Sequence, residues 1–387
     1  MERTPDVTIV GGGPAGSALA VLLGRQGVTV VLYEKAHHPR LKPCGEGLLP
    51  HGVAALRQIA GIPDVPHVKG LRFVAGTASA DADFPNNDDG LVVRRDRFDA
   101  WLFELAGGTP NIDARPGTAY RPGPTGLLVG ADGCHSMFHR QLPGKVASPR
   151  RAGLSSHVVG LTGLGDRVEV FFHDDGELYV APTGGGEALV SALFDYRHFR
   201  RDGITYLLNK TAWLRGRLSH LEFTTPVLAA APLGLYVPRI VDRSQRLLLV
   251  GDAAGTPDPI TAGGLALALA ATRIAADAIV TGAFDEYERR RLEMGRAANR
   301  LGRLILCLGR TERRAEWVLR HLAWGVEPLL NLALRRSQVS GSGPFDFVRQ
   351  KLGRETNAAQ DGLWASGSVA ADTRHLDSRR PTSDSRS

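Results

Sequence analysis

Residues 7–34 read VTIVGGGPAGSALAVLLGRQGVTVVLYE, and this is the most informative stretch of the chain. The β-branched run at 7–10 predicts a buried strand, residues 17–24 predict a helix, and residues 28–33 predict a second strand. Glycines in the pattern GxGxxG separate the first strand from the helix, and an acidic residue ends the second strand. This order of strand, glycine turn, helix, strand and acid is typical of a dinucleotide-binding βαβ unit.

The glycines and the acidic residue have separate physical tasks in such a unit. Gly11 makes the tight turn, Gly13 lets the backbone approach a pyrophosphate, and Gly16 lets helix and strand pack closely. The helix N-terminus offers free N–H groups to the phosphates. Glu34 lies where a carboxylate binds both hydroxyls of an adenosine ribose, which argues against the 2′-phosphate of NADP. The glycines alone leave FAD and NAD open. The residues expected to hold the dinucleotide here are Gly11, Gly13, Pro14, Ala15, Gly16, Glu34 and Lys35.

The charge of the chain limits its partners. The chain has 387 residues, enough for two domains and a tail, and a formal net charge of +7 in which arginine outnumbers lysine. Such a charge suits nucleic acid, an anionic membrane surface or acidic substrates, or it is simply a solvated basic surface. The sequence contains no RNP, zinc or helix-turn-helix pattern, so we expect no nucleic-acid partner.

The cysteines are sparse and are Cys44, Cys134 and Cys307. An odd count without a CxxC pair argues against a disulfide scaffold and for a reducing compartment, so we expect a cytoplasmic location. No His/Cys cluster has metal-ligand spacing, so we expect no metal site. We expect no signal peptide, and no apolar run of about eighteen residues that would span a membrane.

The remaining chain predicts a mixture of strands and helices. Short strands are expected within 70–93 around a turn at 85–90, and further strands over 127–129, 156–159, 168–172, 178–181, 188–194 and 246–250. Helices are expected over 53–59, 94–105, 206–218, 264–280 and within 285–334. Residues 107–126 are rich in glycine and proline and show no clear strand, and the stretch after 353 is expected to be a disordered tail.

Two later motifs also follow predicted strands. Residues 130–136 read GADGCHS, and residues 246–255 read RLLLVGDAAG, followed by PDPITAGGL at 257–265. Asp252 can accept a hydrogen bond from a sugar hydroxyl while the next N–H groups bind phosphate, although an aspartate here can also simply cap a turn. Gly263 and Gly264 open a helix whose N–H groups can face developing negative charge.

In this order and spacing, the three motifs resemble those of the FAD-dependent aromatic hydroxylases, the geranylgeranyl reductases and the flavin halogenases. These enzymes share the fold of para-hydroxybenzoate hydroxylase, and the resemblance covers roughly residues 5–300. It implies FAD as cofactor and NAD(P)H as electron donor. It also implies an α/β fold in which an FAD-binding Rossmann-like domain of the glutathione-reductase type carries an inserted, mostly antiparallel β substrate domain and C-terminal helices.

The resemblance also implies the order of the domains along the chain. The FAD-binding domain is expected in three parts, at 1–70, 94–150 and 241–282. Strands of the substrate domain are expected at 71–93, and its main part at 151–240. C-terminal helices are expected over 283–350 and the disordered tail over 351–387.

Several site residues follow from the resemblance alone. Arg95 is similar to the family arginine close to the FAD diphosphate, and Asp132 lies in a segment near the pyrophosphate and the nicotinamide cofactor. The PCGEG segment at 43–47 resembles the loop beside the isoalloxazine ring in geranylgeranyl-reductase-like proteins, although Cys44 can also be an inert buried thiol. The Tyr179–Pro182 segment resembles the strand over the substrate cavity. The expected catalytic residues are Cys44 and Pro182, and the further cofactor contacts are Cys44, Gly45, Arg95, Asp132, Gly251, Asp252, Gly263, Gly264 and Leu265.

The function that the resemblance implies is an NAD(P)H-dependent monooxygenase. It would hydroxylate a hydrophobic aromatic or quinol-type substrate through a flavin C4a-hydroperoxide. Geranylgeranyl-reductase-like reduction of prenyl C=C bonds and a non-catalytic FAD-binding protein remain as alternatives. Halogenation is disfavoured because the chain lacks the Trp-x-Trp-x-Ile-Pro segment of the halogenases. A methyltransferase that uses S-adenosylmethionine would have no use for Gly251 and Asp252.

Residues 285–336 contain many arginines and no lysine, and Trp317 and Trp324 lie among leucines. A basic amphipathic helix with tryptophans can lie on an anionic bilayer, so peripheral membrane contact is one expectation. The same segment can instead cover a hydrophobic substrate tunnel or pack on the FAD-binding domain. The expected small-molecule partner is a hydrophobic substrate.

Overall fold

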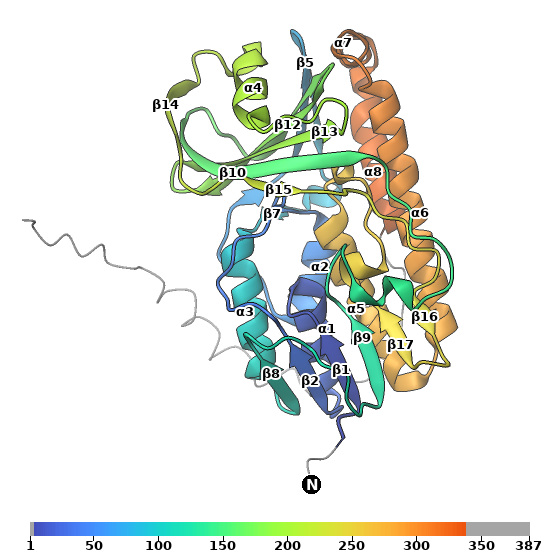
Figure 1. The fold of residues 1–387 in the computed structure, drawn as a ribbon. Coiled ribbons are helices and arrows are strands. Elements are labelled where there is room, and N and C mark those ends of the chain that lie inside the picture. The colour runs from blue at the N-terminus through green and yellow to red at the C-terminus, as the bar shows by residue number, and fades with distance from the viewer. Residues whose placement is uncertain (1–3, 338–387) are drawn as a thin grey trace, which may run out of the picture. The chain divides into compact units, whose positions relative to one another are not determined.

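Six strands from distant parts of the chain form one mostly parallel sheet (Figure 1). The structure, a computed structural model, describes residues 4–337, with side chains as far as residue 331. The strand order is β16 (Val241–Asp242), β17 (Leu247–Leu249), β9 (Leu127–Gly130), β1 (Val7–Val10), β2 (Val30–Tyr33) and β8 (Ile112–Arg115). Because β17, β9, β1 and β2 pair in parallel, the segments that follow them meet at one edge of the sheet.

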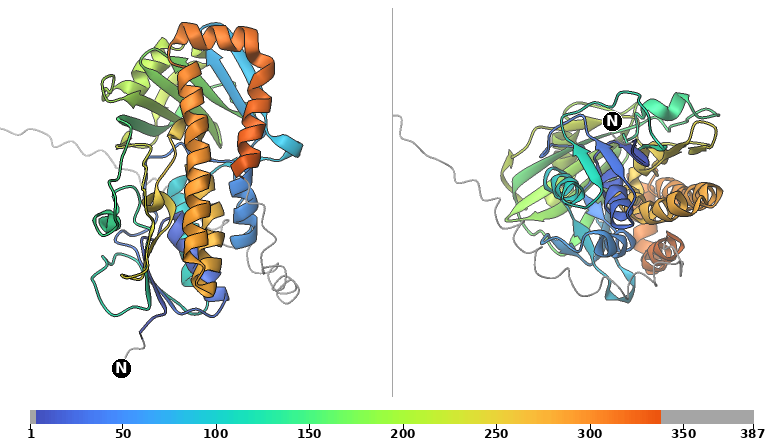
Figure 2. Two further views of the ribbon diagram at one scale, coloured as in Figure 1. Left: turned by 90° about the vertical axis from the view of Figure 1, so that its right-hand side faces the viewer. Right: turned by 90° about the horizontal axis from the view of Figure 1, so that it is seen from below.

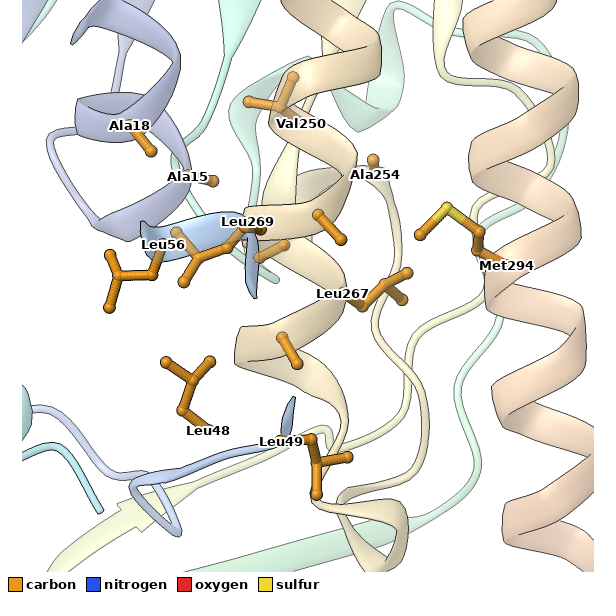
Figure 3. Close-up of a cluster of buried hydrophobic side chains, with 14 of the residues drawn as sticks. Ala15, Ala18, Leu48, Leu49, Leu56, Val250, Ala254, Leu267, Leu269 and Met294 are labelled. Atoms are coloured by element: carbon orange, nitrogen blue, oxygen red, sulfur yellow. The ribbon is translucent and has the colours of Figure 1, made fainter. Parts of the chain in front are cut away.

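Five helices and the six-stranded sheet share one apolar core. Helix α1 (Pro14–Arg25) packs against α3 (Arg95–Gly107) and α5 (Gly264–Thr281), and α5 also packs against α2 (Pro50–Ile59). In Figure 3, alanines of α1 meet leucines of α2 and α5, and Met294 reaches the same core from α6 (Phe284–Leu308). Small residues such as Ala15 and Ala18 let these helices approach closely, which holds the first turn of α1 in place.

A second, eight-stranded sheet contains the long antiparallel strands. Its order is β14 (Leu218–Phe223), β10 (Arg151–Leu161), β13 (Glu187–Asp195), β12 (Gly176–Gly184), β11 (Arg167–His173), β5 (Gly70–Ala75) and β6 (Ala78–Asp83), and β15 (Leu228–Ala230) also pairs with β10. The pairing of β11 with β5 is parallel, so the sheet is mixed. The fold is thus α/β with mixed sheets. A third, small sheet consists of the antiparallel strands β3 (Gly47–Leu48), β7 (Gly90–Val92) and β4 (His67–Val68), with β7 in the middle.

The eight-stranded sheet has two different faces, because successive side chains of a strand point in opposite directions. One face, with Phe171, Val180 and Phe194, packs on helix α4 (Gly203–Lys210) in its own apolar cluster. The other face, with Phe73 and Tyr179, joins the main core. We call this second face the inner face of the large sheet.

The C-terminal helices run beside the large sheet (Figure 2). Helix α6 is followed by α7 (Glu312–Leu322) and α8 (Val326–Ser337), and α7 packs against β5 and β6. The helical prediction for 285–334 is therefore confirmed in type. The predicted tail from 351 onward lies outside the described residues.

Three predictions of secondary structure need correction. The first helix begins at Pro14 rather than at residue 17, because a proline suits the first helical position. The helix predicted over 206–218 ends at Lys210, since Thr211 is extended and Gly216 is left-handed before β14. The segment 107–126 does contain a strand, β8, which pairs with the exposed edge of β2. Pairing with an existing strand edge gives no signal in local sequence.

Helix α5 corrects the expectation that the chain has no long apolar run. Within residues 4–337 it is the one helix whose 18 residues are long and apolar enough to cross a membrane by length and composition. However, 67% of this stretch is buried against α1, α2 and α6. Burial on several sides explains its apolar composition.

Candidate functional site

The glycine turn has no room for a Cβ at two of its glycines but leaves open space at a third. Gly11 has a φ of 114°, and a Cβ there would collide with the carbonyl of Ala131. A Cβ on Gly16 would collide with the carbonyl of Gly11. By contrast, no heavy atom lies within 4 Å of the place that a Cβ on Gly13 would take. A free approach to the backbone at this point is what a bound pyrophosphate needs.

The N-terminus of α1 has no side-chain cap. Gly13 is its N-cap, and no side chain accepts from the first-turn N–H groups. These groups and the positive end of the helix dipole are therefore available to an anion. Pro14 and Ala15 are buried in this first turn, whereas Lys35 is exposed after β2.

Glu34 is held against the glycine turn from the end of β2. Its side chain is 5% exposed, Oε2 accepts from the N–H of Gly12 (2.9 Å), and Oε1 accepts from the N–H of Ala36 (2.9 Å). Oε2 also lies 3.5 Å from the guanidinium of Arg40, whereas Oε1 keeps a second lone pair for a sugar hydroxyl. Gly12 was not predicted as a site residue, yet a Cβ there would lie 2.8 Å from the Glu34 Cβ and closer still to the Phe103 ring. Gly12 could have been identified from its place in the unbroken run of three glycines at 11–13.

The second motif touches the first. The N–H of Ala131 donates to the carbonyl of Val10 (2.8 Å), which joins the end of β9 to the end of β1. Asp132 follows, and its Oδ2 accepts from the N–H of Met137 (2.8 Å). Its Oδ1 is buried and has no hydrogen-bond partner among the described residues. A buried carboxylate oxygen of this kind has a free acceptor for a ligand donor.

The third motif packs on the first turn of α1. Gly251 has a left-handed backbone, with φ 61°, and a Cβ there would lie 2.7 Å from the Cβ of Ala15. Asp252 comes next, in a short 3-10 turn, η4 (Gly251–Ala254), and is half-buried. The buried guanidinium of Arg291, on α6, donates to the carbonyls of Gly251 (3.2 Å) and Gly255. Burial lowers the pKa of Arg291, and no carboxylate forms an ion pair with it among the described residues.

Arg291 is therefore a buried positive charge directly under the third motif, and sequence reasoning missed it. The sequence gives no signal for it because Arg291 is one arginine among many on α6. The loop after the motif ends at Gly263, which is the N-cap of α5, and the N–H of Gly263 donates to Thr261 Oγ1 (3.3 Å). Gly264 and Leu265 begin the helix, whose first turn has no side-chain cap.

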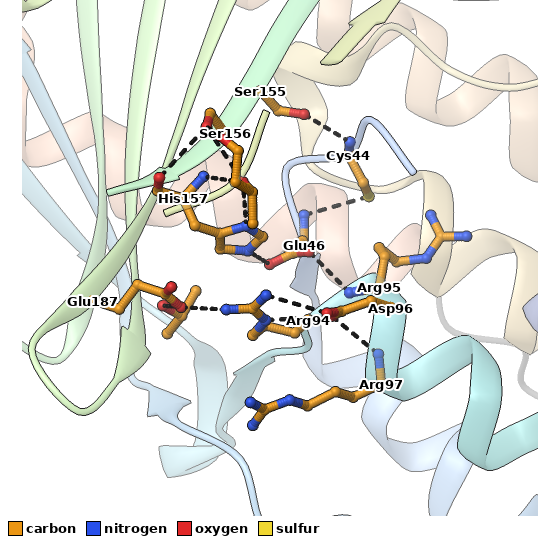
Figure 4. A network of polar contacts seen from close by, with 12 residues as sticks. Cys44, Glu46, Arg94, Arg95, Asp96, Arg97, Ser155, Ser156, His157 and Glu187 are labelled. Carbon is orange, nitrogen blue, oxygen red and sulfur yellow. Dashed lines mark hydrogen bonds and ion pairs between the residues drawn. The ribbon is translucent and has the colours of Figure 1, made fainter. Parts of the chain in front are cut away.

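Cys44 connects the loop after β2 to the large sheet (Figure 4). Its N–H donates to Ser155 Oγ on β10 (3.3 Å), and its Sγ accepts from the N–H of Glu46 (3.3 Å). Gly45 between them is exposed. The loop thus forms a tight turn around the thiol, with its polar groups directed at the sheet.

Glu46 ties the same loop to two further elements. Its Oε1 accepts from the main-chain N–H of Arg95 at the start of α3 (2.8 Å), and its Oε2 lies 3.0 Å from Nε2 of His157 on β10. Neither Glu46 nor His157 was predicted as a site residue. Glu46 could have been identified as the acidic residue of the PCGEG segment, whereas nothing in the sequence indicates that His157 contacts it.

Arg95 is buried beside the thiol. Its guanidinium makes two hydrogen bonds to the carboxylate of Asp99, at 2.7 and 2.8 Å. Burial opposes the charge, but the carboxylate of Asp99 holds the pKa of Arg95 well above its usual value. The structure thus places Arg95 between Asp99 and Cys44, at the base of the loop.

Strand β12 presents Tyr179 rather than Pro182 to the inner face. Tyr179 pairs with Ser191 on β13, and Ser191 pairs with Ser155 on β10, so these side chains share one face with the anchor of Cys44. Pro182 is displaced by an odd number of residues from Tyr179 and lies with Val180 on the opposite face. The structure therefore does not bring the two predicted catalytic residues, Cys44 and Pro182, to the same face of the sheet.

Comparison with known proteins agrees with the three converging motifs. Residues 4–77 match the family "FAD binding domain". The chain is 27% identical over 331 residues to a menaquinone reductase of Mycolicibacterium smegmatis, covering 74% of this chain and 79% of that protein. It is 28% identical over 308 residues to a geranylgeranyl diphosphate reductase of Rhodobacter capsulatus, covering 70% and 74%. It is 26% identical over 309 residues to a squalene monooxygenase of Rattus norvegicus, covering 68% of this chain and 53% of that protein.

Solved structures show the same fold. A flavin-dependent brominase superposes with a TM-score of 0.74 at 18% identity, covering 85% of this chain and 94% of that one. A geranylgeranyl bacteriochlorophyll reductase-like protein from Thermoplasma acidophilum superposes with a TM-score of 0.72 at 19% identity, covering 90% and 99%. At these identities, the likeness concerns the fold alone.

Proposed function

The chain belongs to the FAD-dependent oxidoreductases of the para-hydroxybenzoate hydroxylase and geranylgeranyl reductase superfamily, and we propose that it reduces C=C bonds in the isoprenoid chain of a lipid. Since its relatives are reductases and monooxygenases, the chain is an enzyme, and the non-catalytic alternative is set aside. The observation that carries the proposal is the fixed position of Cys44 against the inner face of the large sheet. In this proposal, the large sheet is the substrate domain.

The residues present fit FAD. The open backbone at Gly13 leaves room for a diphosphate, the uncapped start of α1 offers free N–H donors to it, and the free oxygen of Asp132 offers an acceptor to a donor group of the cofactor. Glu34 would hold the adenosine ribose and Asp252 the ribityl chain. The buried charge of Arg291 favours an anionic group near Gly251 and Gly255.

The chemistry needs one hydride and one proton for each double bond. Bound FAD supplies hydride transfer, and we propose NAD(P)H as the source of the hydride. The proton goes to the neighbouring carbon, and we assign its delivery to the Sγ–H of Cys44. The N–H of Glu46 fixes the Sγ and Ser155 fixes the main chain of Cys44, so the thiol is already oriented when substrate binds.

Monooxygenation is the second candidate, and the similarity to a squalene monooxygenase favours it. The two reactions differ in their use of oxygen. A hydroxylase of a quinol-type or aromatic substrate would consume one O₂ for each NAD(P)H and add one oxygen atom to the product. A reductase consumes no O₂ and adds two hydrogens.

We also propose that the outer surface of the C-terminal helices touches a membrane. Trp317 is 56% exposed and Trp324 is 79% exposed, and both lie among arginines of α7 and the turn after it. Exposed indoles and a positive surface together favour an anionic bilayer. Such contact would bring the site to a substrate dissolved in lipid.

The test begins with the purified protein loaded with FAD, whose visible spectrum reports cofactor binding. NAD(P)H oxidation is then followed under anaerobic and aerobic conditions with geranylgeranyl diphosphate, a naphthoquinone with four isoprene units, and a tail-free phenol. Oxidation without oxygen, with a product two hydrogens heavier, is the expected result. Substrate-dependent O₂ consumption with a product one oxygen heavier would favour the second candidate. A protein that stays colourless with excess FAD would contradict both.

A further inference from the structure

A buried ion pair joins the large sheet to the loop that leads into helix α5. Arg151, at the start of β10, donates to both carboxylate oxygens of Glu177 on β12, at 2.6 and 3.4 Å. Its Nε lies 3.3 Å from Oδ2 of Asp258, in the loop after the third motif. All three side chains are at most 10% exposed. One guanidinium therefore connects two strands of the sheet with the loop.

Asp258 is also bonded to the residues that follow it. Its Oδ1 accepts from the N–H of Ile260 (3.0 Å), and its carbonyl accepts from the hydroxyl of Thr261 (2.9 Å). Thr261 Oγ1 in turn accepts from the N–H of Gly263 (3.3 Å), the N-cap of α5. An unbroken series of ion pairs and hydrogen bonds thus runs from the large sheet to α5. We call this series the Arg151 network, and its members are Glu177, Arg151, Asp258, Thr261 and Gly263.

The backbone of the loop is strained just before α5. Ala262 has a φ of 51°, in the left-handed region that residues with a Cβ rarely adopt. Such conformations persist only where the surrounding contacts hold them, and they cluster at functional sites. The Arg151 network supplies some of these contacts. Helix α6 supplies others, because it packs on the turn η5 (Pro259–Thr261), where a Cβ on Gly302 would lie only 3.2 Å from Thr261 Cγ2.

Net stability does not explain the ion pair. Burial raises the pKa of Glu177 and of Asp258, although Arg151 acts in the opposite direction. The loss of hydration is thus not fully offset by attraction, and a buried pair of this kind contributes little to stability. It does fix the relative position of the elements that it joins. The element positioned here is the first turn of α5, whose N–H groups have no side-chain cap and are available to a negatively charged group.

We propose that Arg151 is a positioning residue for the flavin: through Asp258 and Thr261, it holds the start of α5 in the position that favours the reduced cofactor. Reduction places negative charge on the flavin ring, and N–H groups that are held in advance stabilise such charge without rearrangement. The inference rests on FAD binding in the proposed function. It adds a physical connection between the large sheet and the reduction potential of the flavin.

The test measures the reduction potential of the FAD-loaded protein. The protein is equilibrated with a reference dye during slow reduction, without oxygen, NAD(P)H or lipid substrate. Arg151→Met and Asp258→Asn both break the ion pair, and an asparagine at 258 can still accept from the N–H of Ile260. Arg167→Met is the matched control, at a partly exposed arginine of the same sheet that lies outside the Arg151 network.

Both variants of the ion pair should shift the potential in the same direction. Each should lower the affinity for reduced flavin relative to oxidised flavin about tenfold, which lowers the two-electron potential by about 30 mV. If charge alone acted, loss of a positive group at 151 and of a negative group at 258 would shift the potential in opposite directions. The double variant should show no larger shift than either single variant, because both break one connection. Arg167→Met should leave the affinity ratio within about twofold of wild type, since solvent screens its charge.

Shifts of opposite sign, or an unchanged potential in both variants of the ion pair, would overturn the proposal. A second pair of variants covers the case in which loss of the buried guanidinium prevents folding. Thr261→Val keeps the shape of the side chain but removes the hydroxyl between Asp258 and Gly263, so it should also lower the potential. Thr261→Ser keeps the hydroxyl and should keep the wild-type potential, whereas a role in packing alone would make it the more disturbed of the two. A wild-type potential in Thr261→Val would overturn the proposal.

The measurement separates this inference from the proposed reaction, because it needs no turnover. A protein with the expected shifts that reduces no C=C bond contradicts the proposed reaction alone. Turnover by the wild-type enzyme together with unshifted potentials in the variants contradicts this inference alone. A wild-type protein that binds no FAD contradicts both.

Discussion

Oε2 of Glu46 lies 3.0 Å from Nε2 of His157, and the two side chains are 3% and 5% exposed. The pair joins a loop residue to a strand residue 111 positions away. Through its other oxygen, Glu46 also holds the main-chain N–H of Arg95. This one carboxylate therefore fixes the Cys44 loop relative to both α3 and the large sheet.

Removal of this carboxylate should destabilise the protein. Glu46→Ala leaves the His157 ring and the Arg95 N–H without their partner, and each unsatisfied buried group costs about 1–3 kcal/mol. Urea unfolding measures the change. Glu222→Ala, at an exposed glutamate of β14, is the control and should stay within about 0.5 kcal/mol of wild type. A similar loss in both variants would contradict the role given to Glu46.

Two glycines of the first motif should respond differently to the same substitution. Gly13→Ala places a methyl group in open space, so the free energy of unfolding of the apoprotein should stay within about 1 kcal/mol. Its FAD affinity should fall about tenfold or more, because the methyl group occupies the approach to the pyrophosphate. Gly16→Ala should instead lower apoprotein stability by several kcal/mol, as its Cβ meets the carbonyl of Gly11. Thermal melts and FAD titrations separate the two effects, and unchanged FAD affinity in Gly13→Ala would count against the site.

Arg291 should support both the third motif and the cofactor. Arg291→Met keeps the length of the side chain but loses hydrogen bonds to the carbonyls of Gly251 and Gly255. We expect a loss of about 1.5–3 kcal/mol in stability and weaker FAD binding, measured by urea unfolding and by FAD titration. Arg296→Met, at an exposed position of the same helix, is the matched control. Equal FAD affinity in the two variants would show that the buried charge does not act on the cofactor.

His51 should make stability depend on pH. Burial lowers its pKa to about 4, whereas an unfolded chain binds the proton at about pH 6.5. Between these values the unfolded state holds more protons, so stability is lost as pH falls from 6.5 towards 4. The loss amounts to about 3 kcal/mol. Urea unfolding at pH 7 and pH 4.5 should show that this loss is smaller in His51→Gln by about 2.4 kcal/mol, because the titration is not complete at pH 4.5. An identical pH dependence in both proteins would refute the assignment.

Membrane contact should depend on the two exposed indoles. Flotation with vesicles of phosphatidylglycerol at low salt should carry the wild-type protein upward, and the double variant Trp317→Ser, Trp324→Ser should remain at the bottom. Neutral phosphatidylcholine vesicles are the control for charge. Absence of flotation of the wild-type protein at low salt would remove the membrane from the proposal.

The parts of the site that are local in sequence could be predicted, because their physical cause is local. The glycine turn, α1 and Glu34 follow from one short stretch, and their spacing alone predicts them. His157 could not be predicted, because its role comes from a loop far away in the sequence. Arg291 was missed for the same reason, since only the packing of α6 places it under Gly251.

Errors in the fold had a similar origin. β8 is a strand because β2 offers it an edge, and nothing in its own four residues requires this. Helix α5 is apolar on several sides because neighbouring helices cover it. The sequence shows that the helix is apolar but does not show which helices bury it. Pro182 was chosen from a resemblance between motifs, whereas strand alternation places Tyr179 on the inner face instead.

The parallel sheet also sets the order of events during synthesis. Its adjacent strands β1, β9 and β17 begin at residues 7, 127 and 247. The ribosome must therefore synthesise about two thirds of the chain before β17 can pair with β9. Contacts between segments so far apart in the sequence form slowly. Loading of the cofactor is then a late step in biogenesis, and a chain stalled before residue 247 would display an unpaired edge of β9 that invites aggregation.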